Sequence, residues 1–326
     1  MKALILAGGY GTRLRPLTYT RPKHLLPIAN RPHIEHVLEL LQRHAIDEAV
    51  FLTSYLSGAF ENTVAAAKAR GFTMDVTHEE EPLGTAGALK HAQDHVGDET
   101  FFVFNGDVLT DVDLDALAGF HRDRDAEATI FLTPVEDPSR FGVVPTDYGG
   151  RVQGFIEKPP PGEAPTNLIN AGIYVMEPTV LDRIPKGEVW SSEHQLFPEL
   201  VSDGAGLYAI DISCYWLDIG TPASLLRANL DALSGAFKTD AVPTAGAETS
   251  VIAPNADVAE SAKLTSAAVG DGAVIGEGAA VTRSVLLPGV RVGAGAVVED
   301  SVLGENARVS DGARASGLIG GDDEQI

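Results

Sequence analysis

The last quarter of the chain carries a repeat that restricts its fold more than any other feature. Aliphatic residues follow one another at intervals of six, six and five positions, so the triplet returns every 17 residues. Its members are Ile252, Val258, Leu264, Val269, Ile275, Val281, Leu286, Val292, Val298, Leu303 and Val309. This period predicts a solenoid in which each coil supplies three short strands, buried only by the neighbouring coils. A disordered Gly/Ala-rich tail is the alternative, but disorder would not keep a register over four periods.

The earlier part of the chain has a different pattern. Short apolar runs at residues 2–7, 49–52, 100–104 and 128–132 predict buried strands, and helical stretches such as 34–44 and 86–95 lie between them. This alternation predicts an α/β domain with a mostly parallel sheet. Ligands of such sheets bind at the carboxyl ends of the strands.

A glycine-rich loop follows the first expected strand, with glycines at positions 8, 9 and 11. Backbone N–H groups in such a loop can approach an anion closely. Arginines at positions 13, 15 and 21 and then Lys23 follow with no acidic residue among them, which predicts a polyphosphate ligand. The loop lacks the Gly-Lys-Ser/Thr of a P-loop, and Leu14 stands where a dinucleotide fingerprint needs its third glycine.

The bulk composition excludes several classes of protein. A formal net charge of −22 argues against non-specific nucleic-acid binding, which needs a basic surface. No apolar run approaches membrane-spanning length, and the start of the chain does not have the pattern of a signal peptide. The single cysteine, Cys214, excludes an internal disulfide framework. We therefore expect a cytoplasmic protein with no membrane and no nucleic-acid partner.

The glycine loop resembles the signature of the sugar-1-phosphate nucleotidylyltransferases, Gly-Gly-x-Gly-Thr-Arg-Leu-x-Pro-Leu-Thr followed by Pro-Lys-Pro. His24 replaces the last proline. The resemblance covers nearly all of residues 1–235 and implies a Rossmann-like catalytic domain there. The C-terminal repeat resembles the left-handed parallel β-helix built from hexapeptide repeats. We expect a linker at residues 236–250, the β-helix at 251–320 and a frayed tail at 321–326.

The segment Glu79–Leu89 resembles the base-binding segment of the mannose-1-phosphate guanylyltransferases. Guanine offers N1–H and its 2-amino group as adjacent donors, and a carboxylate can accept both. We therefore expect guanine as the base and favour Glu79 as the residue that binds it. Three glutamates stand in a row here, and the sequence does not fix which of them points inward. Without the resemblance, the Pro-x-Gly-Thr pattern is equally consistent with a plain helix cap.

Two aspartates form the expected metal site. Asp107 follows the expected strand at 100–104, and Asp218 lies between apolar residues. Each alone could serve as a turn or cap residue. Together with a phosphate loop they suit Mg²⁺, which binds one or two carboxylates plus phosphate oxygens. The resemblance implies the same pair of ligands.

The resemblance also implies the sugar-phosphate contacts. Lys158 would bind the sugar phosphate, Glu157 the sugar hydroxyls, and Asn170 with Gly172 a second strand end next to the sugar. Gly142 would let the sugar approach the backbone. Without the family context, the pair at 157–158 would be a solvated ion pair at a strand end.

The expected reaction is the Mg²⁺-dependent transfer of a nucleoside monophosphate from an NTP to a sugar 1-phosphate, with GTP and mannose 1-phosphate favoured. The expected catalytic residues are Arg13, Lys23 and Lys158. The expected nucleotide-binding residues are Leu6, Ala7, Gly8, Gly9, Gly11, Thr12, Arg13, Glu79, Pro82, Gly84, Thr85, Asn105, Gly106 and Asp107. Alternatives are a thymidylyl- or uridylyltransferase acting on glucose 1-phosphate, a guanylyltransferase for another hexose or a cyclitol phosphate, and a non-catalytic nucleotide-sugar sensor. The β-helix could instead be an acyltransferase, but such enzymes typically use a histidine there and the last histidine of the chain is His194. We therefore expect an oligomerisation or regulatory module, with a homo-oligomer formed through the β-helix.

Overall fold

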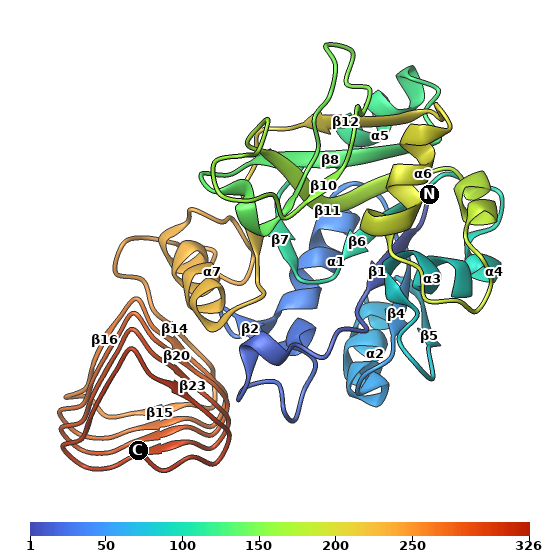
Figure 1. Cartoon of the computed structure of the whole chain (residues 1–326). Helices are drawn as coiled ribbons and strands as arrows, with labels where there is room; N and C mark the ends of the chain where they lie inside the picture. Colours follow the sequence, from blue (N-terminus) through green and yellow to red (C-terminus); the bar gives the residue numbers. More distant parts are fainter. The chain divides into compact units, whose positions relative to one another are not determined.

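The structure, a computed structural model, describes all residues 1–326. The chain forms two compact units (Figure 1). The first unit comprises Met1–Gly9, Leu38–Val108 and Val112–Trp216, and the second comprises Tyr10–Val37, Leu109–Asp111 and Leu217–Ile326. None of the helices combines the length and the apolar character needed to cross a bilayer.

A nine-stranded sheet forms the centre of the first unit. Its main path runs β10-β9-β11-β6-β1-β4-β5, and β8 pairs with both β11 and β12. The strands are β1 (Ala3–Leu6), β4 (Glu48–Thr53), β5 (Thr73–His78), β6 (Phe101–Asn105), β8 (Ala128–Pro134), β9 (Gly142–Val143), β10 (Ile156–Glu157), β11 (Leu168–Met176) and β12 (Leu207–Asp211). Strands β6, β1, β4 and β5 are parallel, as expected, whereas β11 runs antiparallel to β6 and to β8. The α/β fold class is confirmed, and the antiparallel strand makes the sheet mixed.

Helices surround this sheet. They are α1 (His33–Arg43), α2 (Glu61–Ala69), α3 (Gly84–His91), α4 (Gln93–Val96), α5 (Leu114–Asp123) and α6 (Phe197–Ser202). Alternate strand residues such as Leu4, Val50 and Val103 are buried in one cluster with Leu89 of α3 and Phe197 of α6. Residues between them, such as Ala3 and Phe51, are buried as well, so both faces of these strands are covered, which is what continuous apolar runs predict for central parallel strands.

The C-terminal strands confirm the 17-residue repeat. They form three all-parallel sheets, in which Val251–Ile252 aligns with Ala268–Val269 and so on from coil to coil. One sheet contains β14 (Val251–Ile252), β17 (Ala268–Val269), β20 (Val285–Leu286), β23 (Val302–Leu303) and β26 (Ile319–Gly320). The second contains β15 (Asp257–Val258), β18 (Val274–Ile275), β21 (Arg291–Val292) and β24 (Arg308–Val309), and the third β16 (Lys263–Thr265), β19 (Ala280–Thr282), β22 (Val297–Glu299) and β25 (Arg314–Ser316). Figure 1 shows the resulting three-sided coil, the form expected of a left-handed β-helix.

The second unit also contains the loop segment that follows β1. This segment contains two 3-10 helices, η1 (Thr12–Leu14) and η2 (Lys23–Leu25), and the hairpin of β2 (Pro27–Ile28) and β3 (Arg31–Pro32). Helix α7 (Pro222–Ser234) belongs to the same unit. Strands β7 (Val108–Thr110) and β13 (Trp216–Asp218) form a separate two-stranded sheet.

The segments expected as linker and frayed tail are both packed. Phe237 and Val242 of the linker are buried. At the C-terminus, Arg308 N–H donates to Glu324 O and Ile326 N–H to Arg308 O, both at 2.8 Å. The tail therefore continues the pattern of the solenoid, which differs from the fraying expected for residues 321–326. Its Gly-Gly-Asp-Asp composition suggested exposure, but these backbone bonds to the preceding coil hold it.

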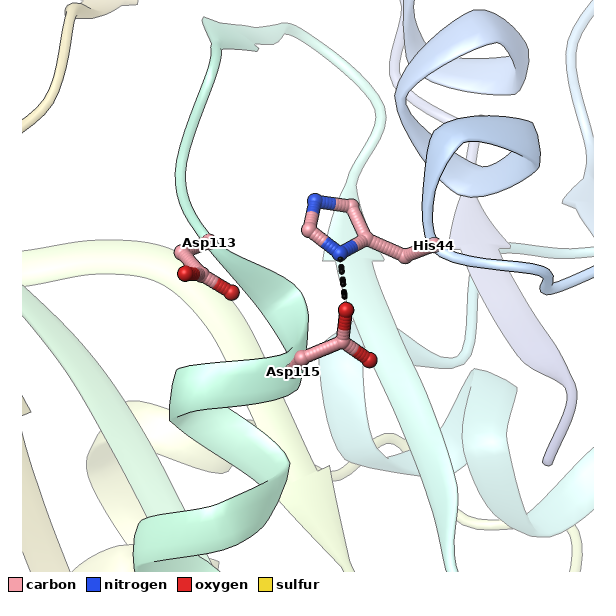
Figure 2. Close-up of side chains that lie close together, drawn as sticks. All are labelled: His44, Asp113 and Asp115. Carbon is pink, nitrogen blue, oxygen red and sulfur yellow. Dashed lines mark hydrogen bonds and ion pairs between the residues drawn. The ribbon is translucent and has the colours of Figure 1, made fainter.

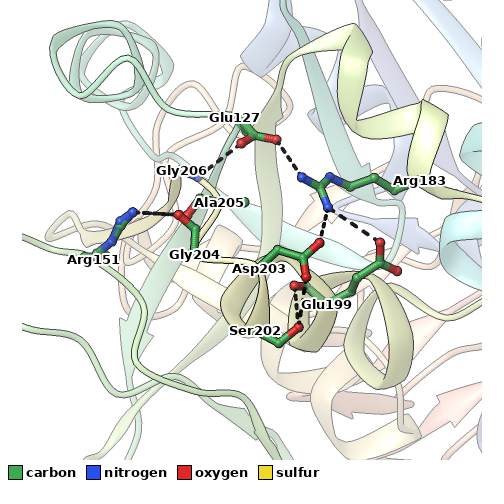
Figure 3. A network of polar contacts seen from close by, with 9 residues as sticks. All are labelled: Glu127, Arg151, Arg183, Glu199, Ser202, Asp203, Gly204, Ala205 and Gly206. Atoms are coloured by element: carbon green, nitrogen blue, oxygen red, sulfur yellow. Dashed lines mark hydrogen bonds and ion pairs between the residues drawn. The ribbon is translucent and has the colours of Figure 1, made fainter.

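Arg183 joins three carboxylates in the first unit (Figure 3). Its guanidinium contacts Glu127 at 3.4 Å, Glu199 at 3.5 Å and Asp203 at 2.8 Å. The Glu127 carboxylate also accepts the N–H of Gly206 at 3.3 Å. This network ties the end of α6 to the residue before β8. A single exposed ion pair contributes at most about 1 kcal/mol to the free energy of unfolding. One arginine shared by three carboxylates also fixes the geometry of the turn that follows α6.

His121 of α5 is a buried titratable group away from the expected site. It lies 2.9 Å from Thr129 Oγ1 and 3.2 Å from Glu177 Oε1. Burial lowers its pKa from the ordinary value of 6.5, and the bond to Glu177 opposes this only in part. The unfolded chain therefore takes up a proton at a higher pH than the folded chain does. Stability is fully present above pH 6.5 and is lost as the pH falls through the lowered pKa.

We expect the free energy of unfolding to drop between pH 7 and pH 5.5, and to drop less in His121→Asn, which does not titrate. Urea denaturation at both pH values measures this. His194→Asn is the control, because that histidine is exposed. An unchanged pH dependence in His121→Asn would show that other groups dominate.

Candidate functional site

The carboxyl ends of β1 and β6 lie side by side. The N–H of Gly106 donates to Leu6 O at 3.0 Å, and that of Ala7 to Leu52 O at 2.8 Å. Leu6 to Gly9 and Asn105 to Asp107 thus share one edge of the sheet, as parallel strands predict. Ser54 Oγ donates to Gly8 O at 2.6 Å, and a Cβ on Gly8 would lie 2.8 Å from this oxygen. A side chain at position 8 would therefore displace Ser54, a residue that no motif of the sequence points to.

Asn105 offers an acceptor at this edge. Its Oδ1 is buried and has no hydrogen-bond partner within the chain. Its Nδ2 lies 2.7 Å from where a Cβ of Gly172 would be, and Gly172 has a positive φ of 76°. Only glycine fits there. Gly172 therefore leaves room for the Asn105 side chain. The buried Oδ1 of Asn105 is suited to accept a hydrogen bond from a ligand.

Of the three consecutive glutamates, only Glu79 faces inward. It is 6 % exposed, whereas Glu80 and Glu81 are exposed. Its Oε2 accepts the N–H of Leu83 at 3.0 Å, which closes the loop that contains the exposed Pro82. Burial raises the pKa of Glu79, and this bond and nearby histidines lower it less. Glu79 therefore closes the loop of residues 79–83, and it is a buried carboxyl group with a raised pKa.

The small residues that open α3 pack against a distant segment. A Cβ on Gly84 would lie 2.7 Å from Trp190 O, and one on Gly87 would lie 2.7 Å from Glu188 O. Thr85 Oγ1 donates to Glu193 Oε2 at 2.9 Å and accepts from the N–H of Ser192 at 2.8 Å. These contacts give the glycines and Thr85 a structural function that local sequence patterns do not reveal.

Glu157 and Lys158 form the ion pair at the end of β10. Lys158 Nζ lies 2.6 Å from Glu157 Oε1, and the lysine side chain is 65 % exposed. A Cβ on Gly142 would lie 2.9 Å from Glu157 Oε2 and 2.6 Å from the Phe155 ring. Gly142 thus makes room for the Glu157 carboxylate. The expected sugar-phosphate residues 142, 157 and 158 are brought together.

Asn170 is engaged within its own strand. Its Oδ1 accepts the N–H of Gly172 at 3.0 Å, and its Nδ2 donates to Tyr174 Oη at 2.8 Å. These bonds span the register shift between Asn170 and Tyr174 in β11. Asn170 therefore stabilises the irregularity that places Gly172 beside Asn105.

In the second unit, Gly11 starts the segment that carries the basic residues. Gly11 adopts a left-handed conformation with φ 61°, directly before Thr12 of η1. Its carbonyl accepts from Thr18 Oγ1 at 2.8 Å, and its Cβ position is 3.3 Å from Lys23 Cβ. The loop thus folds back so that Lys23 lies against the glycine turn.

Arg13 and Asp218 flank one glycine. A Cβ on Gly220 would lie 2.6 Å from Arg13 Nη2 and 2.8 Å from Asp218 Oδ1. A guanidinium nitrogen and a carboxylate oxygen therefore both approach the place that a side chain at position 220 would take. No expectation from the sequence included Gly220. The Asp-Ile-Gly spacing was the signal that could have identified it.

A separate cluster lies on the first unit, between the end of α1 and the start of α5 (Figure 2). Ligand atoms of His44, Asp113 and Asp115 lie within 4.8 Å of one another. His44 Nδ1 is 2.8 Å from Asp115 Oδ2, and Asp113 accepts the N–H of Ala116 at 2.9 Å as the cap of α5. These contacts account for all three side chains, so the cluster needs no metal.

Comparison with known proteins identifies the family. Residues 2–235 match a family model described as Nucleotidyl transferase, which is more than half of the chain. The chain belongs to the nucleotidyl transferase family. Residues 247–326 match a second model, the GMPPB C-terminal domain.

Curated relatives support this assignment. The chain is 42% identical over 234 residues to mannose-1-phosphate guanylyltransferase of Mycobacterium tuberculosis, an alignment that covers 72% of this chain and 65% of the relative. It is 44% identical over 228 residues to the catalytic subunit beta of mannose-1-phosphate guanylyltransferase of Drosophila melanogaster, covering 69% of this chain and 61% of the relative. The chain thus spans somewhat less than two-thirds of the length of these relatives.

A solved structure gives the same fold. HddC from Yersinia pseudotuberculosis, solved in complex with GMP-PN, has a TM-score of 0.62 and 27% identity. The likeness covers 73% of this chain and 99% of that one.

Proposed function

We propose that this nucleotidyl transferase moves GMP from GTP to a sugar 1-phosphate, with mannose 1-phosphate favoured, and releases pyrophosphate. The observation that carries the proposal is that Arg13 and Asp218 both lie beside Gly220, and that the loop of Arg13 also holds Lys23 against Gly11. Cationic side chains around a glycine turn suit a triphosphate. The guanylyltransferase relatives support the choice of GTP and mannose 1-phosphate.

The reaction is an in-line displacement at the α-phosphorus. An oxygen of the sugar phosphate forms the new P–O bond while the bond to the β-phosphate oxygen breaks, and pyrophosphate leaves. Arg13 would hold the leaving phosphates, and Lys23 would neutralise charge at the α-phosphate. The protein thus contributes position and charge and needs no covalent intermediate.

The sugar phosphate would be held by the ion pair of β10. The exposed Lys158 ammonium suits the phosphate, and the Glu157 carboxylate accepts hydrogen bonds from sugar hydroxyls. Binding of phosphate would compete with Glu157 for Lys158, since the two side chains are 2.6 Å apart. This competition would free Glu157 oxygens for hydroxyls as the phosphate binds.

Asp107 and Asp218 would hold a divalent cation, Mg²⁺ in this proposal. Hard carboxylate oxygens are the ligands that this ion prefers, so the chemistry of these two half-buried side chains suits it. When bound, the ion would neutralise developing charge on the phosphates. Arg13 and Asp218 lie beside the same glycine, so the guanidinium would be available to a phosphate near the cation.

Guanine would be read by Glu79. The structure orients this carboxylate inward while its two neighbours are exposed, which supports the choice among the three glutamates. Only one of its oxygens is used by Leu83 N–H, so lone pairs remain for N1–H and the 2-amino group.

The substitution Glu79→Gln tests whether Glu79 binds the guanine base. Glutamine keeps an acceptor for Leu83 but presents a donor to guanine, so the preference for GTP over UTP and dTTP should fall by about tenfold or more, in line with the loss of a charge-assisted bond. The folded state should not be destabilised, because burial already raises the pKa of this carboxyl. Ratios of kcat/KM for the three nucleotides measure the effect, with Glu80→Gln as control. An unchanged ranking would exclude Glu79 as the base reader.

The proposed reaction is tested by pyrophosphate release. Release should require both GTP and the sugar 1-phosphate, with one NDP-sugar formed per pyrophosphate. A nucleotide-sugar sensor would bind without release, but Arg13, Lys23, Asp107, Lys158 and Asp218 are all present. Binding of both substrates without turnover would favour the sensor. The cytoplasmic location and the homo-oligomer stay predictions.

A further inference from the structure

The loop segment that carries Lys23 is tied to the last coil of the β-helix within the second unit. Arg21, two residues before Lys23, donates from Nη1 and Nη2 to Asp322, at 3.2 and 3.0 Å. Its Nη2 also lies 3.0 Å from Glu305 Oε2. The Arg21 side chain is only 12 % exposed, so these carboxylates are the counter-charges of a largely desolvated guanidinium.

Asp322 is fully engaged by this contact. Its Oδ2 accepts from Thr20 Oγ1 at 2.6 Å as well as from Arg21, and its Oδ1 accepts the N–H of Glu305 at 2.8 Å. The carboxylate is 14 % exposed. A bidentate arginine–carboxylate pair with two further donors is among the stronger polar contacts a protein makes. Asp322 thus joins the loop to the coil at one fixed geometry.

The rest of the segment is anchored as well. Asn30 Nδ2 donates to Val269 O at 2.8 Å and to Val251 O at 3.3 Å, which are backbone groups of the first two coils. A Cβ on Gly321 would lie 3.2 Å from Pro16, so the tail packs against the loop before Thr20. Lys23 therefore lies between two contacts with the solenoid.

We propose that Asp322 is a positioning residue for nucleotidyl transfer, which fixes Arg21 and through it the place of Lys23. The inference rests on the proposed function, because the task of Lys23 at the α-phosphate is itself a proposal. It gives the β-helix a part in the reaction without any catalytic side chain of its own. The C-terminal residues 321–326 then hold the loop segment that carries Lys23 in place.

The physical reason is the geometry that transfer requires. An asparagine at 322 keeps the shape but loses the charge, and its amide N–H₂ would face the Thr20 and Arg21 donors. Arg21 would keep only its Nη1 bond to the remaining oxygen of residue 322 and its pair with Glu305, and would be free to shift toward Glu305. A displacement of about 1 Å at a group that stabilises the transition state can lower a rate by about 10²-fold.

The test is the full chain with Asp322→Asn. We expect kcat for pyrophosphate release to fall by about 10- to 100-fold while KM for the sugar 1-phosphate stays within about twofold. Asp323→Asn is the matched control, since it removes the same charge from the adjacent exposed residue, and it should keep the wild-type rate. Asp322→Glu should recover part of the rate by restoring the charge.

A double variant separates positioning from a structural effect. If Asp322 acts through Lys23, Asp322→Asn should change the residual rate little in a Lys23→Ala background, because the group it positions is absent. A loss no larger than in Asp323→Asn, or an equal loss with and without Lys23, would overturn the inference. Should Asp322→Asn not fold, Arg21→Lys provides the same comparison, because lysine cannot bridge both Asp322 oxygens. A Lys23→Ala variant with the wild-type rate would instead contradict the proposed task of Lys23 at the α-phosphate, whereas a wild-type chain that releases no pyrophosphate would contradict the proposed function.

Discussion

Lys23→Ala should lower kcat for pyrophosphate release by about 10²- to 10³-fold, which corresponds to roughly 3–4 kcal/mol of lost electrostatic stabilisation. The ammonium is proposed to neutralise charge that builds up on the α-phosphate, so its loss should act on the transition state more than on substrate binding. KM for GTP should therefore change much less than kcat. Initial rates at saturating GTP and sugar 1-phosphate measure the effect.

The control for this prediction is Lys68→Ala. Lys68 is an exposed residue of α2, and its substitution removes the same charge from the first unit. It should leave the rate unchanged. A Lys23→Ala enzyme with a rate within about threefold of the wild type would remove Lys23 from the catalytic residues.

Asp107→Asn should abolish the divalent-cation-dependent release of pyrophosphate while the protein stays folded. The amide keeps the size of the carboxylate but loses the negative charge that a hard cation needs. Asp107 is half-buried at the end of β6, beside the backbone bond of Gly106 to Leu6, which the change does not alter. The measurements are the Mg²⁺ dependence of the rate and titration of Mg²⁺ with GTP into the variant.

Asp123→Asn is the matched control, because Asp123 is an exposed residue of α5. It should keep both the rate and its Mg²⁺ dependence. If Asp107→Asn keeps its turnover with an unchanged Mg²⁺ dependence, the metal assignment is wrong.

The sequence predicts most of what repeats or alternates. The 17-residue period specifies the register of the β-helix, because each coil buries its aliphatic positions only when its strands align with those of the next coil. The apolar runs predict β1, β4, β6 and β8 because buried parallel strands need such runs. The inward orientation of Glu79 among three glutamates depends on the path of the loop before α3, and no period encodes it.

Contacts between distant segments could not be read from the sequence. Gly84 and Gly87 are glycines because backbone carbonyls about a hundred residues later occupy the space of a Cβ. Gly220 is a glycine because Arg13 and Asp218 flank it. In each case the local pattern shows that a side chain is missing, and only the fold shows what takes its place.

The tail shows the same limit. Residues 321–326 have a composition typical of a flexible end. Their order comes from backbone bonds to the preceding coil and from the pairing of Asp322 with Arg21, some 300 residues earlier.

A matrix of pyrophosphate-release rates, with five NTPs against mannose 1-phosphate, glucose 1-phosphate and a cyclitol phosphate, is the most direct test of the proposed reaction. We expect kcat/KM to be highest for GTP with mannose 1-phosphate, and no pair to react without a divalent cation. A clear preference for UTP or dTTP, or no release with any pair, would contradict it.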